Sequence, residues 1–62
     1  MIKWEDFIDG TLQYKRGDVV AYVEPDGYWH IWSGNIRLKT GMSSNRRQAQ
    51  HDALRAINTI RQ

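Results

Sequence analysis

Cysteine is absent from this sequence of 62 residues, and proline occurs only once. Without cysteine the chain can form neither a disulfide nor a thiolate zinc site, so a reducing, cytoplasmic location is expected. Long apolar runs are missing as well: no stretch approaches the ~20 residues of a membrane span, and none resembles a signal peptide. The sequence therefore predicts a protein with no membrane partner, no metal site and no cofactor.

An excess of charge of either sign is also lacking, since nine basic and seven acidic side chains give a net charge of +2. So small an excess is weak support for a nucleic-acid partner by itself. The chain has room for one domain, residues 1–62, which must use nearly every large apolar side chain in a core or an interface. No nucleophile–base pair and no glycine-rich phosphate loop is visible, so an enzyme is not expected.

Hydrophobic periodicity predicts an α+β fold of the type β-β-β-α, in which an antiparallel sheet packs on one C-terminal helix. Residues 45–61 carry one apolar helical stripe, and Asn45 with Gln48 resembles a capping box at the helix start. The spacing of Trp4, Phe7 and Ile8 predicts a helical turn within residues 1–10. The sheet, within residues 12–42, is assigned strands at 18–24, 28–33 and 36–40, with a fourth short strand near residues 12–14 as an alternative.

Two turn signals set the register of the predicted sheet. Asp26-Gly27 supplies the positive φ that closes a hairpin, and Gly34-Asn35 forms a tight two-residue turn. Side chains that oppose each other across strands lie on the same face of a sheet. One face, which the helix stripe should cover, therefore collects Val19, Ala21, Val23, Trp29, Ile31, Ile36 and Leu38. The opposite face collects Val20, Tyr22, Glu24, Tyr28, His30, Trp32, Arg37 and Lys39.

The second face is expected to stay uncovered, because the chain offers no second helix of comparable length. It mixes aromatic rings with cations, and such a surface suits nucleic acid, where cations meet phosphates and rings stack or reach base edges. Two other interpretations stay open: the rings cover one another beneath the N-terminal segment, or they bind another protein. Arg46-Arg47 opens the helix against its macrodipole, a small cost that a phosphate partner would offset.

Residues 27–60 resemble a known family. An aromatic pair follows Gly27, a third strand ends near a glycine, and Asn45-Arg46-Arg47 opens an alanine-rich helix. This order is similar to the arm-type DNA-binding domain at the N-terminus of phage tyrosine-recombinase integrases. The resemblance implies a three-stranded antiparallel sheet that packs on one helix and lies in the major groove of duplex DNA. It implies DNA contacts by Tyr28, His30, Trp32, Arg37 and Lys39, and phosphate contacts by Arg46 and Arg47.

The sequence thus predicts a small accessory or regulatory protein of phage or prophage origin that binds double-stranded DNA through the uncovered sheet face. The alternative is a phage-encoded protein-binding module, such as an anti-CRISPR-type inhibitor of a host protein, or a chain that self-associates through its aromatic face. A monomer and a homodimer are both compatible with the sequence. The expected DNA-binding residues are Tyr22, Tyr28, His30, Trp32, Arg37, Lys39, Arg46 and Arg47.

Overall fold

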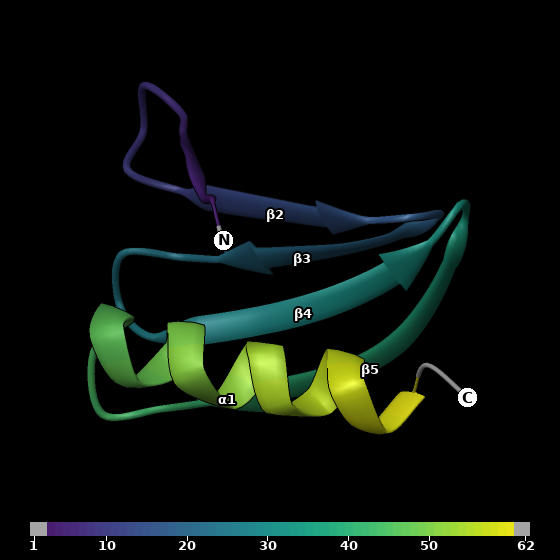
Figure 1. Ribbon diagram of the computed structural model, residues 1–62. Coiled ribbons are helices and arrows are strands. Elements are labelled where there is room, and N and C mark those ends of the chain that lie inside the picture. The colour runs from purple at the N-terminus through teal and green to yellow at the C-terminus, as the bar shows by residue number, and fades with distance from the viewer. Residues whose placement is uncertain (1–2, 61–62) are drawn as a thin grey trace.

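The computed structural model describes residues 3–60, which form one antiparallel sheet with a helix across one of its faces (Figure 1). The strands follow one another in the sheet in chain order. The α+β prediction is confirmed, but the sheet has five strands rather than three or four. The elements are β1 (Glu5–Asp6), β2 (Leu12–Arg16), β3 (Val19–Val23), β4 (Tyr28–Ser33), β5 (Ile36–Met42) and α1 (Arg46–Ile60).

The N-terminal segment does not form the predicted helical turn. Residues 1 and 2 of that prediction, and residue 61 of the predicted helix, lie outside the described residues. β1 instead pairs with β2, and the N–H of Phe7 donates to the carbonyl of Thr11 at 2.9 Å in the connecting turn. A single helical turn fixes three residues for one hydrogen bond, whereas the hairpin pairs the same backbone with a strand already held in the sheet. The pairing brings Trp4 to Tyr14, with ring centroids 5.5 Å apart and both side chains against the core.

Residues 24–28 form the predicted hairpin turn between β3 and β4. The N–H of Glu24 donates to the carbonyl of Tyr28 at 2.7 Å, and the N–H of Gly27 donates to the carbonyl of Glu24 at 3.1 Å. Gly27 has a φ of 100°, and a Cβ there would lie 2.5 Å from the carbonyl oxygen of Ser43. Both the conformation and the close approach require glycine. The register predicted for β3 against β4 is confirmed.

A β-bulge in β5 changes the predicted register of the last strand. The two-residue turn places Trp32 opposite Arg37 as predicted, but Leu38 is then an extra residue with no partner in β4. Lys39 takes the position opposite Ile31 that was predicted for Leu38. Since a shift of one residue moves side chains to the other face, Lys39 lies on the helix side of the sheet. The prediction that Lys39 shares a face with Arg37 is wrong, and Leu38 is 39% exposed.

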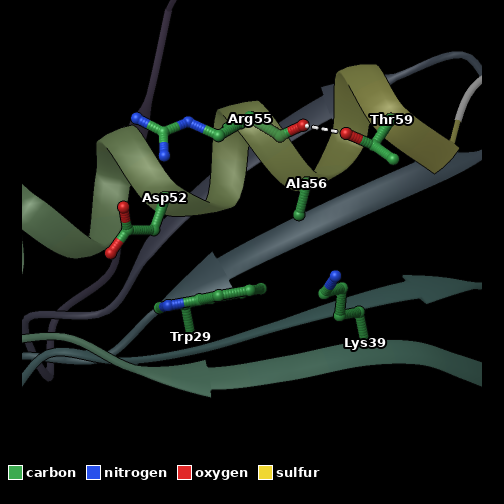
Figure 2. A pocket seen from close by; sticks show the side chains of 6 residues that line it. All are labelled: Trp29, Lys39, Asp52, Arg55, Ala56 and Thr59. Carbon is green, nitrogen blue, oxygen red and sulfur yellow. Dashed lines mark hydrogen bonds between the residues drawn. The ribbon is translucent and has the colours of Figure 1, made fainter.

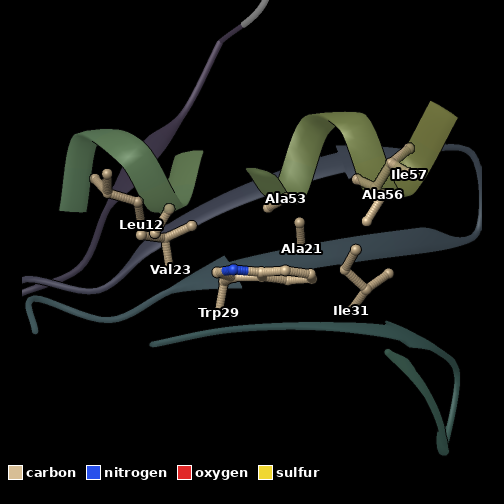
Figure 3. Close-up of a cluster of buried hydrophobic side chains, with 9 residues drawn as sticks. Leu12, Ala21, Val23, Trp29, Ile31, Ala53, Ala56 and Ile57 are labelled. Atoms are coloured by element: carbon tan, nitrogen blue, oxygen red, sulfur yellow. The ribbon is translucent and has the colours of Figure 1, made fainter. Parts of the chain in front are cut away.

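The hydrophobic core lies between α1 and the face of the sheet that α1 covers (Figure 3). Ile31 and Ile57 are buried at its centre, and burying a side chain of this size contributes roughly 1.5–3 kcal/mol. The predicted helical stripe is confirmed, and its alanines allow α1 to lie close to β3 and β4. The buried residues are Leu12, Ala21, Val23, Trp29, Ile31, Ala49, Ala53, Ala56 and Ile57.

Trp29 lies over the backbone of Gly41 on the neighbouring strand. A Cβ on Gly41 would lie 2.3 Å from an atom of the indole ring, so only glycine leaves room for the ring in this position. The indole Nε1–H donates to the hydroxyl of Ser43 at 3.2 Å, and that hydroxyl donates to Asp52 of α1 at 2.5 Å. This series of bonds ties the end of β5 to the helix.

Asn45 caps the start of α1, because its Oδ1 accepts a hydrogen bond from the N–H of Gln48 at 2.9 Å. The side-chain NH2 of Gln48 donates to Asp52 at 3.1 Å, and among the described residues no hydrogen bond from the Asn45 N–H to the Gln48 side-chain oxygen completes the predicted capping box. Within residues 3–60, no helix combines the length and the apolar character that crossing a membrane requires.

Candidate nucleic-acid interface

The face of the sheet turned away from α1 is covered by no other element of residues 3–60 (Figure 1). We refer to it as the open face. The alternative in which the N-terminal segment covers it does not hold for Trp4, which packs against Tyr14 on the helix side. Strand pairing arranges the side chains of the open face in cross-strand rows. These rows are Lys15, Val20, Trp32, Arg37; then Glu5, Gln13, Tyr22, His30, Thr40; and then Glu24, Tyr28, Met42.

Four predicted site residues stand together at the centre of the open face. The imidazole of His30 stacks with Tyr22 and Tyr28 at centroid distances of 5.1 Å and 5.2 Å, and Trp32 meets it edge-on at 6.3 Å. Three of them come from alternate positions of β4, which point to the same side of a strand. All four are half-buried, so each ring keeps part of its surface accessible to a partner. The four side chains therefore form one continuous aromatic surface.

Hydrogen bonds fix the orientation of the imidazole. Trp32 Nε1–H donates to His30 Nδ1 at 2.7 Å, and because an indole nitrogen can only donate, Nδ1 must accept. A neutral imidazole then carries its proton on Nε2, which donates to Glu24 Oε2 at 3.2 Å. The other carboxylate oxygen of Glu24 accepts from the hydroxyl of Thr11, also at 3.2 Å. The rings are thus ordered on folding, which lowers the entropy lost when a partner binds.

Two cations lie at opposite ends of one cross-strand row of the open face. The guanidinium of Arg37 lies 5.9 Å from the centroid of the Trp32 ring, a cation–π contact. Lys15 stands at the other end of the same row, on β2. Both side chains are exposed, and neither forms an ion pair with any group of residues 3–60. The open face therefore offers a cation at each end of this row and aromatic surface at its centre, with the carboxylates of Glu5 and Glu24 in the other two rows.

Lys39 lies instead in a shallow cleft between β5 and α1, on the far side of the sheet from the rings (Figure 2). Asp52 in this cleft accepts hydrogen bonds from the Ser43 hydroxyl and the Gln48 amide, and these bonds lower the pKa of its carboxyl below the usual value. Because the sheet separates the cleft from the open face, Lys39 cannot act together with the rings. The cleft is lined by Trp29, Lys39, Asp52, Arg55, Ala56 and Thr59.

Arg46 and Arg47 are also separated from the rings, because α1 lies across the other face of the sheet (Figure 1). They stand near the β3–β4 turn, where Gly27 approaches the backbone of Asn45. Arg46 Nη1 donates to the carbonyl of Gly10 at 3.2 Å, which links the helix start to the β1–β2 turn. Arg46 thus has a structural contact that the sequence does not indicate.

The strand pairing places on the open face five residues that the sequence did not predict for it: Glu5, Gln13, Lys15, Thr40 and Met42. The position of Lys15 could have been predicted, because Leu12 and Tyr14 face the core from the same strand and Lys15 alternates with them. Thr40 and Met42 reach the open face through the bulge in β5, which no residue type in the sequence marks. In the part of the chain that the structure describes, no group of three or more His, Asp or Glu side chains is placed to hold a metal ion.

Comparisons of the chain with protein-family models, with curated proteins and with solved structures found no match. The resemblance to integrase arm-type domains accordingly stays a prediction.

Proposed function

We propose that the protein is a small non-enzymatic accessory factor that binds double-stranded DNA through its open face. The observation that carries the proposal is the grouping of Tyr22, Tyr28, His30 and Trp32 on one uncovered face, with Arg37 against the Trp32 ring. Aromatic surface beside unpaired cations is suited to a partner that offers both phosphates and bases. The integrase resemblance points to the same surface.

The dimensions of the sheet are compatible with the major groove. Neighbouring strands lie about 4.8 Å apart, so β3, β4 and β5 together span about 10 Å, and the major groove is about 12 Å wide. Lys15 and Arg37 are three strand intervals apart, which is about 14 Å. The two cations can therefore reach phosphates on the two walls of the groove, while the hydroxyls of Tyr22 and Tyr28 face base edges.

The salt dependence of binding tests the proposal. If Lys15, Arg37 and one further cation neutralise two or three phosphates, the logarithm of the affinity should fall with the logarithm of salt concentration at a slope of about −2 to −3. Fluorescence anisotropy of a labelled random duplex gives this slope directly. An affinity that does not respond to salt, or the absence of binding at low salt, contradicts the proposal.

Arg37 and Lys39 provide a matched pair of variants. They belong to the same strand, and both are exposed cations, but they lie on opposite faces of the sheet. We expect Arg37→Gln to weaken DNA binding by about 1–3 kcal/mol and to reduce the salt slope by about one. Lys39→Gln makes the same change of charge and should leave the affinity within about twofold. Equal losses would show that net charge, rather than the open face, attracts DNA.

A protein-binding role for the open face, such as inhibition of a host protein, is the second candidate. It is favoured by the position of Lys39, because the bulge removes one of the expected cations from this face. A protein partner would make Trp32 a hot spot, so that Trp32→Ala costs about 2 kcal/mol or more in binding. Arg37→Gln would then have little effect, whereas DNA binding requires the arginine.

A further inference from the structure

The two edges of the sheet differ in length and chemistry. β1 has two residues, both acidic, whereas β5 has seven residues. Ile36, Leu38 and Met42 of β5 are 65%, 39% and 66% exposed. An edge strand presents a row of unpaired main-chain groups, which pair readily with another chain when the strand is long. The edge of β5 is therefore the place where a further strand can be added.

The hydrogen-bond pattern indicates which groups of β5 point toward this edge. The N–H of Ser43 donates to the carbonyl of Gly27 at 2.9 Å, so these two residues form a hydrogen-bonded pair. Hydrogen-bonded and non-hydrogen-bonded pairs alternate along antiparallel strands. Met42 and Thr40 are therefore in non-hydrogen-bonded pairs with β4, and their N–H and C=O groups point outward. The bulge at Leu38 ends this regular stretch.

A second copy of β5 fits the edge best in the antiparallel register centred on Gly41. Thr40 of each copy then lies opposite Met42 of the other, and the two hydrogen-bonded pairs supply about four main-chain bonds. In the register centred on Thr40, Thr40 lies opposite Thr40 of the second copy and Met42 lies opposite the bulged Leu38. Only one regular hydrogen-bonded pair then remains. In the register centred on Lys39, Lys39 lies opposite Lys39 of the second copy, and like charges directly opposite each other are destabilising.

The side chains agree with the register centred on Gly41. Thr40 and Met42 both lie on the open face, so each Met42 loses solvent exposure against Thr40 of the second copy. On the helix side, Lys39 lies opposite Ser43 of the second copy, whose hydroxyl is bonded to Asp52. Lys39 thus approaches a carboxylate of the second copy, whereas within one chain it forms no ion pair with any group of residues 3–60.

We propose that two copies of the chain associate edge to edge through β5, with a two-fold axis at Gly41. The association extends the sheet continuously from one copy into the other and leaves both aromatic surfaces uncovered on the same side. It differs from self-association through the aromatic face, and it does not depend on DNA binding.

Thr40→Pro tests the proposal through the main chain. Proline removes the outward N–H of Thr40 but no hydrogen bond to β4, and edge strands tolerate proline at such positions. In light scattering coupled to size-exclusion chromatography, the unchanged chain should approach twice its mass of 7.3 kDa as its concentration rises. Thr40→Pro should stay at the monomer mass, and Thr40→Val, which keeps the N–H, should dimerise. An unchanged chain that is monomeric at every concentration, or a Thr40→Pro variant that dimerises equally, overturns the proposal.

Cysteine cross-linking tests the register and decides the question if Thr40→Pro fails to fold. The chain has no cysteine of its own, so single variants give an unambiguous result. When Thr40→Cys and Met42→Cys proteins are mixed and oxidised, the mixed disulfide should dominate, because these two positions face each other. In a dimer of one variant with itself, the two cysteines are offset by two residues along the paired strands. Their Cα atoms then lie beyond the roughly 7 Å limit for a disulfide. Equal yields of the three products, or no cross-linking at all, would overturn the proposal.

Discussion

The two faces of the sheet are built from alternate residues of the same strands, yet their side chains differ in kind. The helix side holds a buried aliphatic and aromatic core centred on Ile31, which is inaccessible to solvent. The open face holds half-buried rings that meet at His30, where the two tyrosines stack on the imidazole and Trp32 donates a hydrogen bond to it. Because successive residues of a strand point to opposite sides, the same strands supply both a core and a surface. The difference assigns stability mainly to the helix side, and our proposal assigns recognition to the open face; each half of that statement can be tested separately.

The largest expected difference is between substitutions on the two sides of one strand pair. Ile31→Ala on the helix side should lower the free energy of unfolding by about 2–5 kcal/mol, because it leaves a cavity at the centre of the core. Val20→Ala on the open face should cost about 1 kcal/mol or less, since that side chain is only half-buried. Urea unfolding followed by circular dichroism measures both values. Similar losses for the two variants would contradict a one-sided core.

Gly41→Ala should have the next largest effect. The added Cβ would lie 2.3 Å from the indole of Trp29, so the ring must move out of its place in the core, at a cost of about 1–3 kcal/mol. Thr40→Ala changes the neighbouring residue on the open face and should alter stability by no more than about 0.5 kcal/mol. Near-ultraviolet circular dichroism reports the change around Trp29. A Gly41→Ala variant as stable as the unchanged chain would show that Trp29 does not depend on this close approach.

The sequence was sufficient to predict the strands from residue 18 onward, because both hairpin turns carry glycine in positions that only a few turn types use. Asp26-Gly27 determined which residues of β3 and β4 share a face, and that prediction is confirmed. The sheet edges were less predictable. Trp4, Phe7 and Ile8 have helical spacing, but the short segment gains more from pairing with β2 than from one isolated helical turn.

The position of Lys39 shows why part of the candidate site could not be predicted. A bulge adds one residue to one strand, and no propensity or turn signal marks Leu38 as that residue. The exchange of Lys39 for Thr40 on the open face follows from that single insertion. The contact of Arg46 with the carbonyl of Gly10 could not be predicted for a different reason, since it joins segments far apart in the sequence.

A smaller effect is expected from removing one hydrogen bond of the open face. Trp32→Phe keeps an aromatic ring beside His30 but removes the donor to Nδ1, and should lower stability by about 0.5–1.5 kcal/mol. Nitrogen-15 NMR of the unchanged chain should show the neutral imidazole protonated at Nε2, and the Nδ1 signal should shift in the variant. Trp4→Phe, on the helix side, should leave both imidazole signals in place. An imidazole protonated at Nδ1 in the unchanged chain would contradict the proposed bonding.

The smallest expected effect is a pH dependence on the helix side. Hydrogen bonds from Ser43 and Gln48 lower the pKa of Asp52 from its usual value of 3.8. A carboxyl with a depressed pKa stabilises the fold fully above its unfolded pKa, and this contribution is lost as the pH falls through the folded pKa. The stability difference between the unchanged chain and Asp52→Asn should therefore be constant near neutral pH and shrink below about pH 4. Unfolding curves recorded across this range measure it, and a difference that persists at the lowest pH would show that the charge of Asp52 is not responsible.

An amide-shift titration with a random DNA duplex tests the proposed function most directly, because it reports binding and its location together. The account predicts shifts in the unchanged chain at Tyr22, Tyr28, His30, Trp32 and Arg37, and the loss of most of these shifts in Arg37→Gln but not in Lys39→Gln. Shifts confined to α1 and the cleft around Lys39, or no shifts at all, would contradict it.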